Sequence, residues 1–179
     1  MDFSQDHFAL FGLPRQYALD PVRLGSRYHE IMAQVHPDKH AHLSDTEQRL
    51  AMQWTSRINE AYQVLSKPLS RAKYLLSLAG VDVDHGTQMS GEFLMRQMEM
   101  REAVAEARSA GDVTKLEDLH QRMQGELATE YAALERGLAG DTAASTQAVQ
   151  AGATKLLRQL MFQEKLLQEI DDALSAAEA

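Results

Sequence analysis

The sequence contains no cysteine. Its absence excludes disulfide bonds, a thiolate nucleophile, cysteine-ligated zinc and a metal cluster held by the chain's own thiolates. No apolar run approaches the roughly 18 residues that a membrane-spanning helix needs. Alternating runs of β-branched residues, which would predict strands, are also missing. We therefore expect an all-α protein that has no cofactor of its own and does not cross a membrane.

Positive charge is scarce in the second half of the chain. Residues 1–79 contain nine Lys and Arg and eight Asp and Glu, a net charge of +1, whereas residues 80–179 contain nine and eighteen, a net charge of −9. Nucleic-acid binding requires clustered Lys and Arg, so this half argues against it. A basic protein partner fits better, although an acidic surface that serves only solubility explains the excess equally well.

The first six residues, Met-Asp-Phe-Ser-Gln-Asp, are acidic and lead directly into a helical pattern. Signal and transit peptides have the opposite chemistry, with basic and apolar or basic and serine-rich segments. The sequence therefore favours a bacterial cytoplasmic protein.

The tripeptide His36-Pro37-Asp38 separates two long amphipathic patterns. The apolar residues at helical spacing are Leu24, Tyr28, Ile31, Met32 and Val35 before it and Leu50, Trp54, Ile58, Ala61, Tyr62 and Leu65 after it. Because Pro37 fixes its own φ, lacks an N–H group and pushes His36 out of the α region, the first helix must end near there. We predict an antiparallel helical hairpin with His36 and Asp38 at its tip.

The helical period breaks at residues 80–88, which contain two glycines, and we predict a linker there between domains at 1–79 and 89–175. Ser90 and Asp112 can cap the first two of three further helices. The predicted apolar stripes are Phe93, Met100, Val104 and Ala107; then Leu116, Leu119, Met123, Leu127, Leu134 and Leu138; then Val149, Ala153, Leu156, Leu160, Leu167, Ile170 and Leu174. Short breaks favour antiparallel neighbours, so the second domain is predicted to be a three-helix bundle.

The first half resembles the J-domain, the module by which J-proteins stimulate the ATPase of DnaK-type chaperones. The resemblance rests on His36-Pro37-Asp38 and on segments 8–14, 58–65 and 68–76, which are similar to the first, third and fourth helices of that module. It covers about residues 5–78.

Segments 74–80 and 93–102 narrow the likeness to the HscB subfamily of iron–sulfur cluster co-chaperones, and with them it covers nearly the whole chain. The resemblance implies a non-enzymatic protein that stimulates an HscA-type chaperone of the DnaK class. It also implies that the C-terminal bundle delivers an IscU-type scaffold protein to that chaperone, while ATP and the cluster belong to the partners.

The resemblance places the chaperone contacts at the hairpin tip and on the preceding helix: His36, Pro37, Asp38, Lys39, Arg27 and Arg23. Arg23 and Arg27 lie one turn apart, and the apolar stripe points elsewhere, so both should be exposed. Many J-domains have Lys or Arg at the positions of Ala33 and Gln34, and an aromatic residue at that of Val35. The attraction to the chaperone is therefore expected to be weaker, or tuned to one specialised partner.

The helix predicted over residues 90–110 has a second apolar face. Leu94, Met95 and Met98 lie about 100° to 200° from Phe93, among glutamates, although a bundle helix needs only one apolar face. Phe162 lies about 160° from the apolar stripe predicted for its own helix, so core packing does not explain it either. The resemblance assigns the scaffold contacts to Leu94, Met95, Met98, Glu99, Arg101, Glu102, Glu106 and Phe162. The alternative is that Leu94 and Met98 pack against the N-terminal domain.

Two other functions remain open. A general J-protein for unfolded clients would usually carry a Gly/Phe-rich linker or a Cys-rich client domain, and the sequence has neither. His36, His40 and His42 could instead bind zinc or nickel, although no fourth ligand is evident. No Ser/His/Asp set, Gly-rich phosphate loop or carboxylate pair indicates catalysis.

Overall fold

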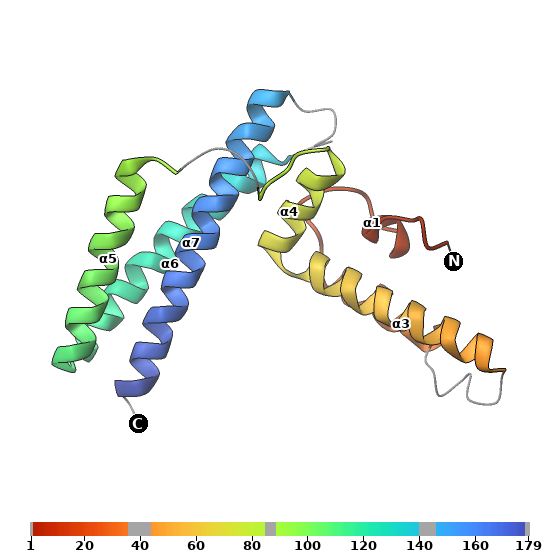
Figure 1. Cartoon of the computed structure of the whole chain (residues 1–179), viewed down its shortest axis with the longest axis horizontal. Helices are drawn as coiled ribbons and strands as arrows, with labels where there is room; N and C mark the ends of the chain where they lie inside the picture. Colours follow the sequence, from red (N-terminus) through yellow and green to blue (C-terminus); the bar gives the residue numbers. More distant parts are fainter. Residues whose placement is uncertain (1, 36–43, 85–88, 140–145, 178–179) are drawn as a thin grey trace. The chain divides into compact units, whose positions relative to one another are not determined.

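The computed structural model describes residues 2–35, 44–84, 89–139 and 146–177. Within them it contains seven helices and no strand, so the all-α prediction is confirmed (Figure 1). The helices are α1 (His7–Leu10), α2 (Pro21–Val35), α3 (Asp45–Ser66), α4 (Pro68–Leu78), α5 (Gly91–Ala110), α6 (Val113–Gly137) and α7 (Gln147–Ala177).

The chain forms two compact units, Met1–Gly80 with Leu138–Ala144, and Val81–Gly137 with Ser145–Ala179. In the second unit the Val83 carbonyl accepts a hydrogen bond of 2.7 Å from Arg158 Nε in α7. The domain limits expected from the sequence stay a prediction, because part of the linker lies outside the described residues.

Helices α2 and α3 form the antiparallel hairpin. The Tyr28 hydroxyl donates to Asn59 Oδ1 at 2.8 Å, and the Thr55 hydroxyl approaches the Val35 carbonyl at 3.5 Å, so residue numbers rise on one helix as they fall on the other. Since α2 ends opposite Thr55, the first turns of α3 extend beyond it. This explains why Leu50, which was expected in the apolar stripe, is 46% exposed.

Local sequence accounts for the ends of these helices. At the start of α3 the Ser44 side chain accepts from the Glu47 backbone N–H, and the Glu47 carboxylate accepts from the Ser44 N–H, which is a capping box. Pro68 occupies the first turn of α4, where its missing N–H costs nothing. Fully buried side chains of this unit are Phe8, Phe11, Ile58, Leu65 and Leu76.

His7 is a buried titratable group of the first unit. Its ring stacks on Tyr74, and its Nδ1 is buried without a hydrogen-bond partner. Burial, with a smaller contribution from Arg57, lowers the pKa of His7 below its ordinary value of 6.5, although Glu60 and Asp6 oppose the shift. Folding therefore favours the neutral form of the His7 imidazole over its charged form.

Acid should therefore destabilise this unit through His7. Because the pKa is lower in the folded state, the unfolded chain binds more protons, and stability falls as the pH drops below about 6.5. We expect urea unfolding at pH 5.5 to need less denaturant than at pH 7.5. The His7→Phe variant keeps a ring there and should lose part of this difference; an unchanged pH dependence would contradict the assignment.

The ends of α5 and α6 agree with the sequence. The Ser90 side chain accepts from the Phe93 N–H at the start of α5, and Gly111 ends the helix with φ +64, the left-handed region that glycine adopts most easily. Asp112 Oδ1 accepts from the Lys115 N–H and caps α6. All residues of the stripes predicted for these two helices are buried, including Leu138 just after α6.

The stripe predicted for α7 is partly wrong. Val149 is 42% exposed and Leu156 and Leu167 are only partly buried, whereas Leu157 and Leu166 are fully buried. The reason is that α7 packs on two helices: it follows α6, and part of it also packs on the shorter α5 (Figure 1). Its buried face therefore turns along the helix and does not follow one fixed stripe.

None of the helices in the described part of the chain is both long and apolar enough to cross a bilayer.

Candidate partner-binding surfaces

The predicted tip of the hairpin lies outside the described residues. His36, Pro37, Asp38 and Lys39 belong to the segment that joins the end of α2 to the start of α3, and their role stays a prediction. Of the three positions on α2 that depart from many J-domains, Ala33 and Gln34 are exposed, whereas Val35 is buried at 9% exposure and belongs to the core of the hairpin.

Arg23 and Arg27 are both exposed residues of α2, as predicted. Arg27 also has an internal role that the sequence did not indicate. Its Nε donates to the Phe11 carbonyl at 3.1 Å, and its Nη1 donates to Glu30 at 2.9 Å. The guanidinium covers Gly12, which has φ +62, and a Cβ there would lie 2.9 Å from Arg27 Nη2. Arg27 therefore ties the turn after α1 to α2.

Arg27→Ala should lower stability as well as any chaperone contact. Loss of the bond to the Phe11 carbonyl should cost about 1 kcal/mol of unfolding free energy. Arg23→Ala is the matched control, because the exposed Arg23 side chain forms no hydrogen bond or ion pair with a described residue, and it should change stability by less than about 0.5 kcal/mol. Equal midpoints in urea unfolding for the two variants would refute the internal role of Arg27.

The second apolar face of α5 is exposed. Leu94, Met95 and Met98 are 43%, 64% and 62% exposed, while Phe93 on the opposite side is buried at 8%. The bundle itself thus leaves these three side chains uncovered. Phe162 of α7, 41% exposed, adds to them, and we call these four residues the apolar patch.

The sequence suggested that Phe162 takes no part in core packing, but the structure shows one contact with the core. Its ring meets the ring of buried Phe93 edge to face, with centroids 6.3 Å apart. One edge of Phe162 therefore packs on the bundle while the rest is exposed to solvent. The contact between the two phenylalanines is what joins the α5 and α7 parts of the apolar patch.

Charged residues surround the apolar patch. Glu99, Glu102 and Glu106 are exposed on α5, and Glu106 approaches Lys115 at 3.9 Å. Arg101 Nε donates to Glu169 Oε2 of α7 at 3.2 Å, with both side chains 41% exposed. The resemblance assigned Arg101 to the scaffold contacts but could not indicate its partner in this chain, which lies 68 residues away along the sequence.

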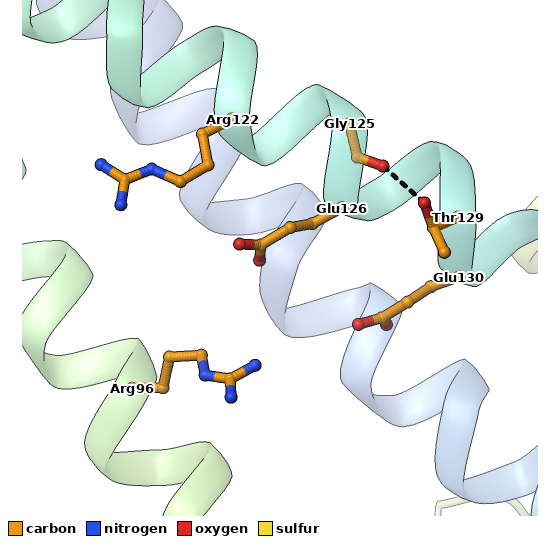
Figure 2. A pocket seen from close by; sticks show the side chains of 6 residues that line it. All are labelled: Arg96, Arg122, Gly125, Glu126, Thr129 and Glu130. Carbon is orange, nitrogen blue, oxygen red and sulfur yellow. Dashed lines mark hydrogen bonds between the residues drawn. The ribbon is translucent and has the colours of Figure 1, made fainter.

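A separate polar groove lies between α5 and α6, and the sequence did not predict it. Figure 2 shows its lining side chains: Arg96, Arg122, Gly125, Glu126, Thr129 and Glu130. Its volume is about 440 Å³. Arg96 is about 160° from Leu94 around α5, so the groove opens away from the apolar patch. Two arginines and two glutamates line it, so it favours ligands of neither sign.

No group of three or more His, Asp or Glu able to hold a metal occurs among the residues that the structure describes. His36, His40 and His42, the metal ligands considered from the sequence, lie outside them.

Comparison with known proteins identifies the family. Residues 6–74 match the DnaJ domain family, and residues 89–171 match the family described as HSCB C-terminal oligomerisation domain. The sequence is 51% identical over 182 residues to the co-chaperone protein HscB homolog of Azoarcus sp. strain BH72, covering 99% of this chain and 98% of the relative. The chain belongs to the HscB co-chaperone family.

Other HscB proteins agree over nearly the whole length. The HscB homolog of Aromatoleum aromaticum is 48% identical over 180 residues, covering 99% of this chain and 98% of the relative. The structure of chaperone HscB from Vibrio cholerae superimposes with a TM-score of 0.84 at 33% identity, over 96% of this chain and 99% of that one. The crystal structure of human co-chaperone protein HscB superimposes with a TM-score of 0.84 at 25% identity, over 96% of this chain and 83% of that one.

Membership establishes the general function. The chain is a J-domain co-chaperone of iron–sulfur cluster biogenesis and not an enzyme, as the sequence predicted. Its J-domain implies a chaperone partner of the Hsp70 type. The particular partners, the contact residues and the cytoplasmic location stay predictions.

Proposed function

We propose that this HscB-family protein binds an IscU-type scaffold through the apolar patch and its charged rim, and stimulates the ATPase of an HscA-type chaperone through the hairpin. The observation that carries the proposal is the exposure of Leu94 and Met98, together with the exposed part of Phe162, on a bundle whose predicted α5 and α6 core stripes are already buried. Exposed apolar side chains grouped on one face of a soluble protein usually mark an interaction surface. Methionine suits such a surface because its unbranched side chain adapts to the partner.

The rim residues give the patch chemical selectivity. Glu99, Glu102 and Glu106 can pair with Lys or Arg of the scaffold, which fixes its orientation more than it adds affinity. The apolar centre supplies most of the binding energy, because its contacts exclude water once the partner is seated.

The hairpin supplies the second activity. Asp38 offers a carboxylate to an arginine of the chaperone, His36 a ring that donates or accepts a hydrogen bond, and Pro37 a rigid backbone that loses little entropy on docking. Binding there shifts the chaperone between its conformations, which is a coupling between sites and needs no catalysis by the co-chaperone.

One chain that carries both surfaces raises the local concentration of scaffold at the chaperone. A tethered ligand can reach an effective concentration in the millimolar range when the tether spans the two sites. Scaffold and co-chaperone together should therefore stimulate ATP hydrolysis much more than the sum of their separate effects.

The test is steady-state ATP hydrolysis by a purified HscA-type chaperone, with this protein, with an IscU-type scaffold, and with both. A rise well above additivity supports the proposal. Stimulation that is independent of the scaffold would indicate a general J-protein instead. No stimulation of the HscA-type chaperone would refute the proposed pairing.

A further inference from the structure

Cationic side chains lie at one edge of the apolar patch, and the sequence pattern alone did not group them. Helices α5 and α7 run in the same direction, since Phe93 meets Phe162 and, about two turns later on each helix, Arg101 meets Glu169. These two contacts mark the seam where the two helices meet. Between them along the helices lie Leu94 and Met98 of the patch on α5 and Lys165 on α7.

Arg101 is only partly satisfied by its ion pair. Its Nε donates to Glu169, and neither terminal nitrogen has a partner among the described residues. The side chain is 41% exposed. A guanidinium can bind a second carboxylate through its terminal nitrogens, and Glu169 leaves that edge available.

Lys165 is the second cation near this ion pair, because residues four apart on a helix are neighbours and Glu169 pairs with Arg101. It is one turn beyond Phe162 and one turn before Glu169, about 60° around α7 from Phe162. Leu166 next to it is fully buried, whereas Lys165 is exposed and forms no ion pair within 4.0 Å with any described residue. An exposed, unpaired cation next to an apolar patch stands out in a half-chain whose net charge is −9.

Positive and negative charges therefore lie on different sides of the apolar patch. The glutamates of the rim, Glu99 and Glu102, lie about 160° and 100° around α5 from Arg101, toward the outer side of the helix. The Phe162 side of the patch carries Arg101 and Lys165, together with the Glu169 carboxylate that pairs with Arg101. A partner that covers Leu94, Met98 and Phe162 meets positive charge on one side and negative charge on the other.

We infer that Arg101 and Lys165 together bind a carboxylate side chain of the scaffold, and that Lys165 is a specificity residue of this interface. The inference rests on the proposed function and adds the orientation in which the scaffold binds. The scaffold surface is bipolar: an Asp or Glu faces the α5–α7 seam, apolar side chains cover the patch, and Lys or Arg faces the outer glutamates. The reversed orientation places like charges together on both sides, which excludes it.

Charge reversal in the full-length chain tests this directly. Lys165→Glu should weaken scaffold binding about tenfold in calorimetry at about 50 mM salt, and by less at about 300 mM, where screening shortens the range of the interaction. Lys155→Glu is the matched control. It makes the same charge change at an exposed position on the same helix, about 15 Å away, and should alter the affinity less than about twofold.

A reciprocal change in the partner identifies the carboxylate. Single Asp→Lys and Glu→Lys substitutions on the scaffold surface should include one that weakens binding to the unaltered chain and restores binding to Lys165→Glu. Equal affinities of Lys165→Glu and Lys155→Glu would overturn the inference, and so would the absence of any rescuing substitution. If these fail while Leu94→Ala still reduces binding, only the inference is lost; if the unaltered chain does not bind the scaffold, the proposed function falls too.

Discussion

His36→Gln is expected to abolish the stimulation of the chaperone's ATPase while leaving scaffold binding unchanged. Glutamine keeps a polar side chain of similar length but lacks the ring, so any contact that depends on imidazole geometry is lost. Couplings between sites are typically 5- to 150-fold, and we expect stimulation to fall by at least about tenfold. Steady-state hydrolysis by the HscA-type chaperone, with the scaffold present, measures this.

Two neighbouring histidines provide controls for this variant. His40→Gln and His42→Gln make the same chemical change nearby and should retain stimulation, because the resemblance to J-domains assigns no contact to them. If all three variants lost activity together and the unaltered chain bound zinc or nickel stoichiometrically, the metal-binding alternative would replace the J-domain interpretation of this segment. Scaffold affinity should be the same in all four proteins, since the apolar patch is unaltered.

The variant Leu94→Ala/Met98→Ala/Phe162→Ala is expected to weaken scaffold binding by about a hundredfold or more. Truncating an apolar anchor at the centre of an interface typically costs more than 1 kcal/mol, so three cost about 3 kcal/mol together. Calorimetry with the scaffold measures the loss. Stimulation of the chaperone without scaffold should be retained, because the hairpin is unchanged.

The stability of this triple variant shows whether the three side chains belong to an interaction surface or to the core. Leu94 and Met98 are 43% and 62% exposed, and their truncation should change the unfolding free energy by less than about 0.5 kcal/mol each. The edge contact of Phe162 with Phe93 should add about 1 kcal/mol. Val149→Ala is the control, since Val149 is 42% exposed on the same helix but about 20 Å from Phe162, and this variant should bind scaffold normally. A loss of several kcal/mol would show instead that these side chains are core.

The ends of the helices, and the apolar stripes of helices whose buried face keeps one direction, could be predicted well from the sequence. Ser90 and Asp112 cap helices through bonds that span three residues, so the information is local. The stripes of α5 and α6 also agree, because each follows one direction along its helix. Prediction failed on α7, where Leu166 is buried because a second helix packs on part of its length.

The candidate site likewise combines features that the sequence predicts with features that depend on how the helices pack. Periodicity identified Leu94, Met95 and Met98 as a face without a partner in the bundle, and the structure shows all three exposed. Periodicity could not show that Phe162 meets Phe93, since the two lie on helices that are far apart in sequence.

The sequence by itself predicted an all-α protein in two parts, because helix caps and proline positions act over a few residues, and its resemblance to the J-domain and HscB families predicted a co-chaperone. Only the tertiary structure decided which charged side chains work together. Arg27 holds the Phe11 carbonyl across 16 residues, and Arg101 pairs with Glu169 across 68. Such pairs depend on which helices pack side by side. A single sequence does not encode that adjacency in any local pattern.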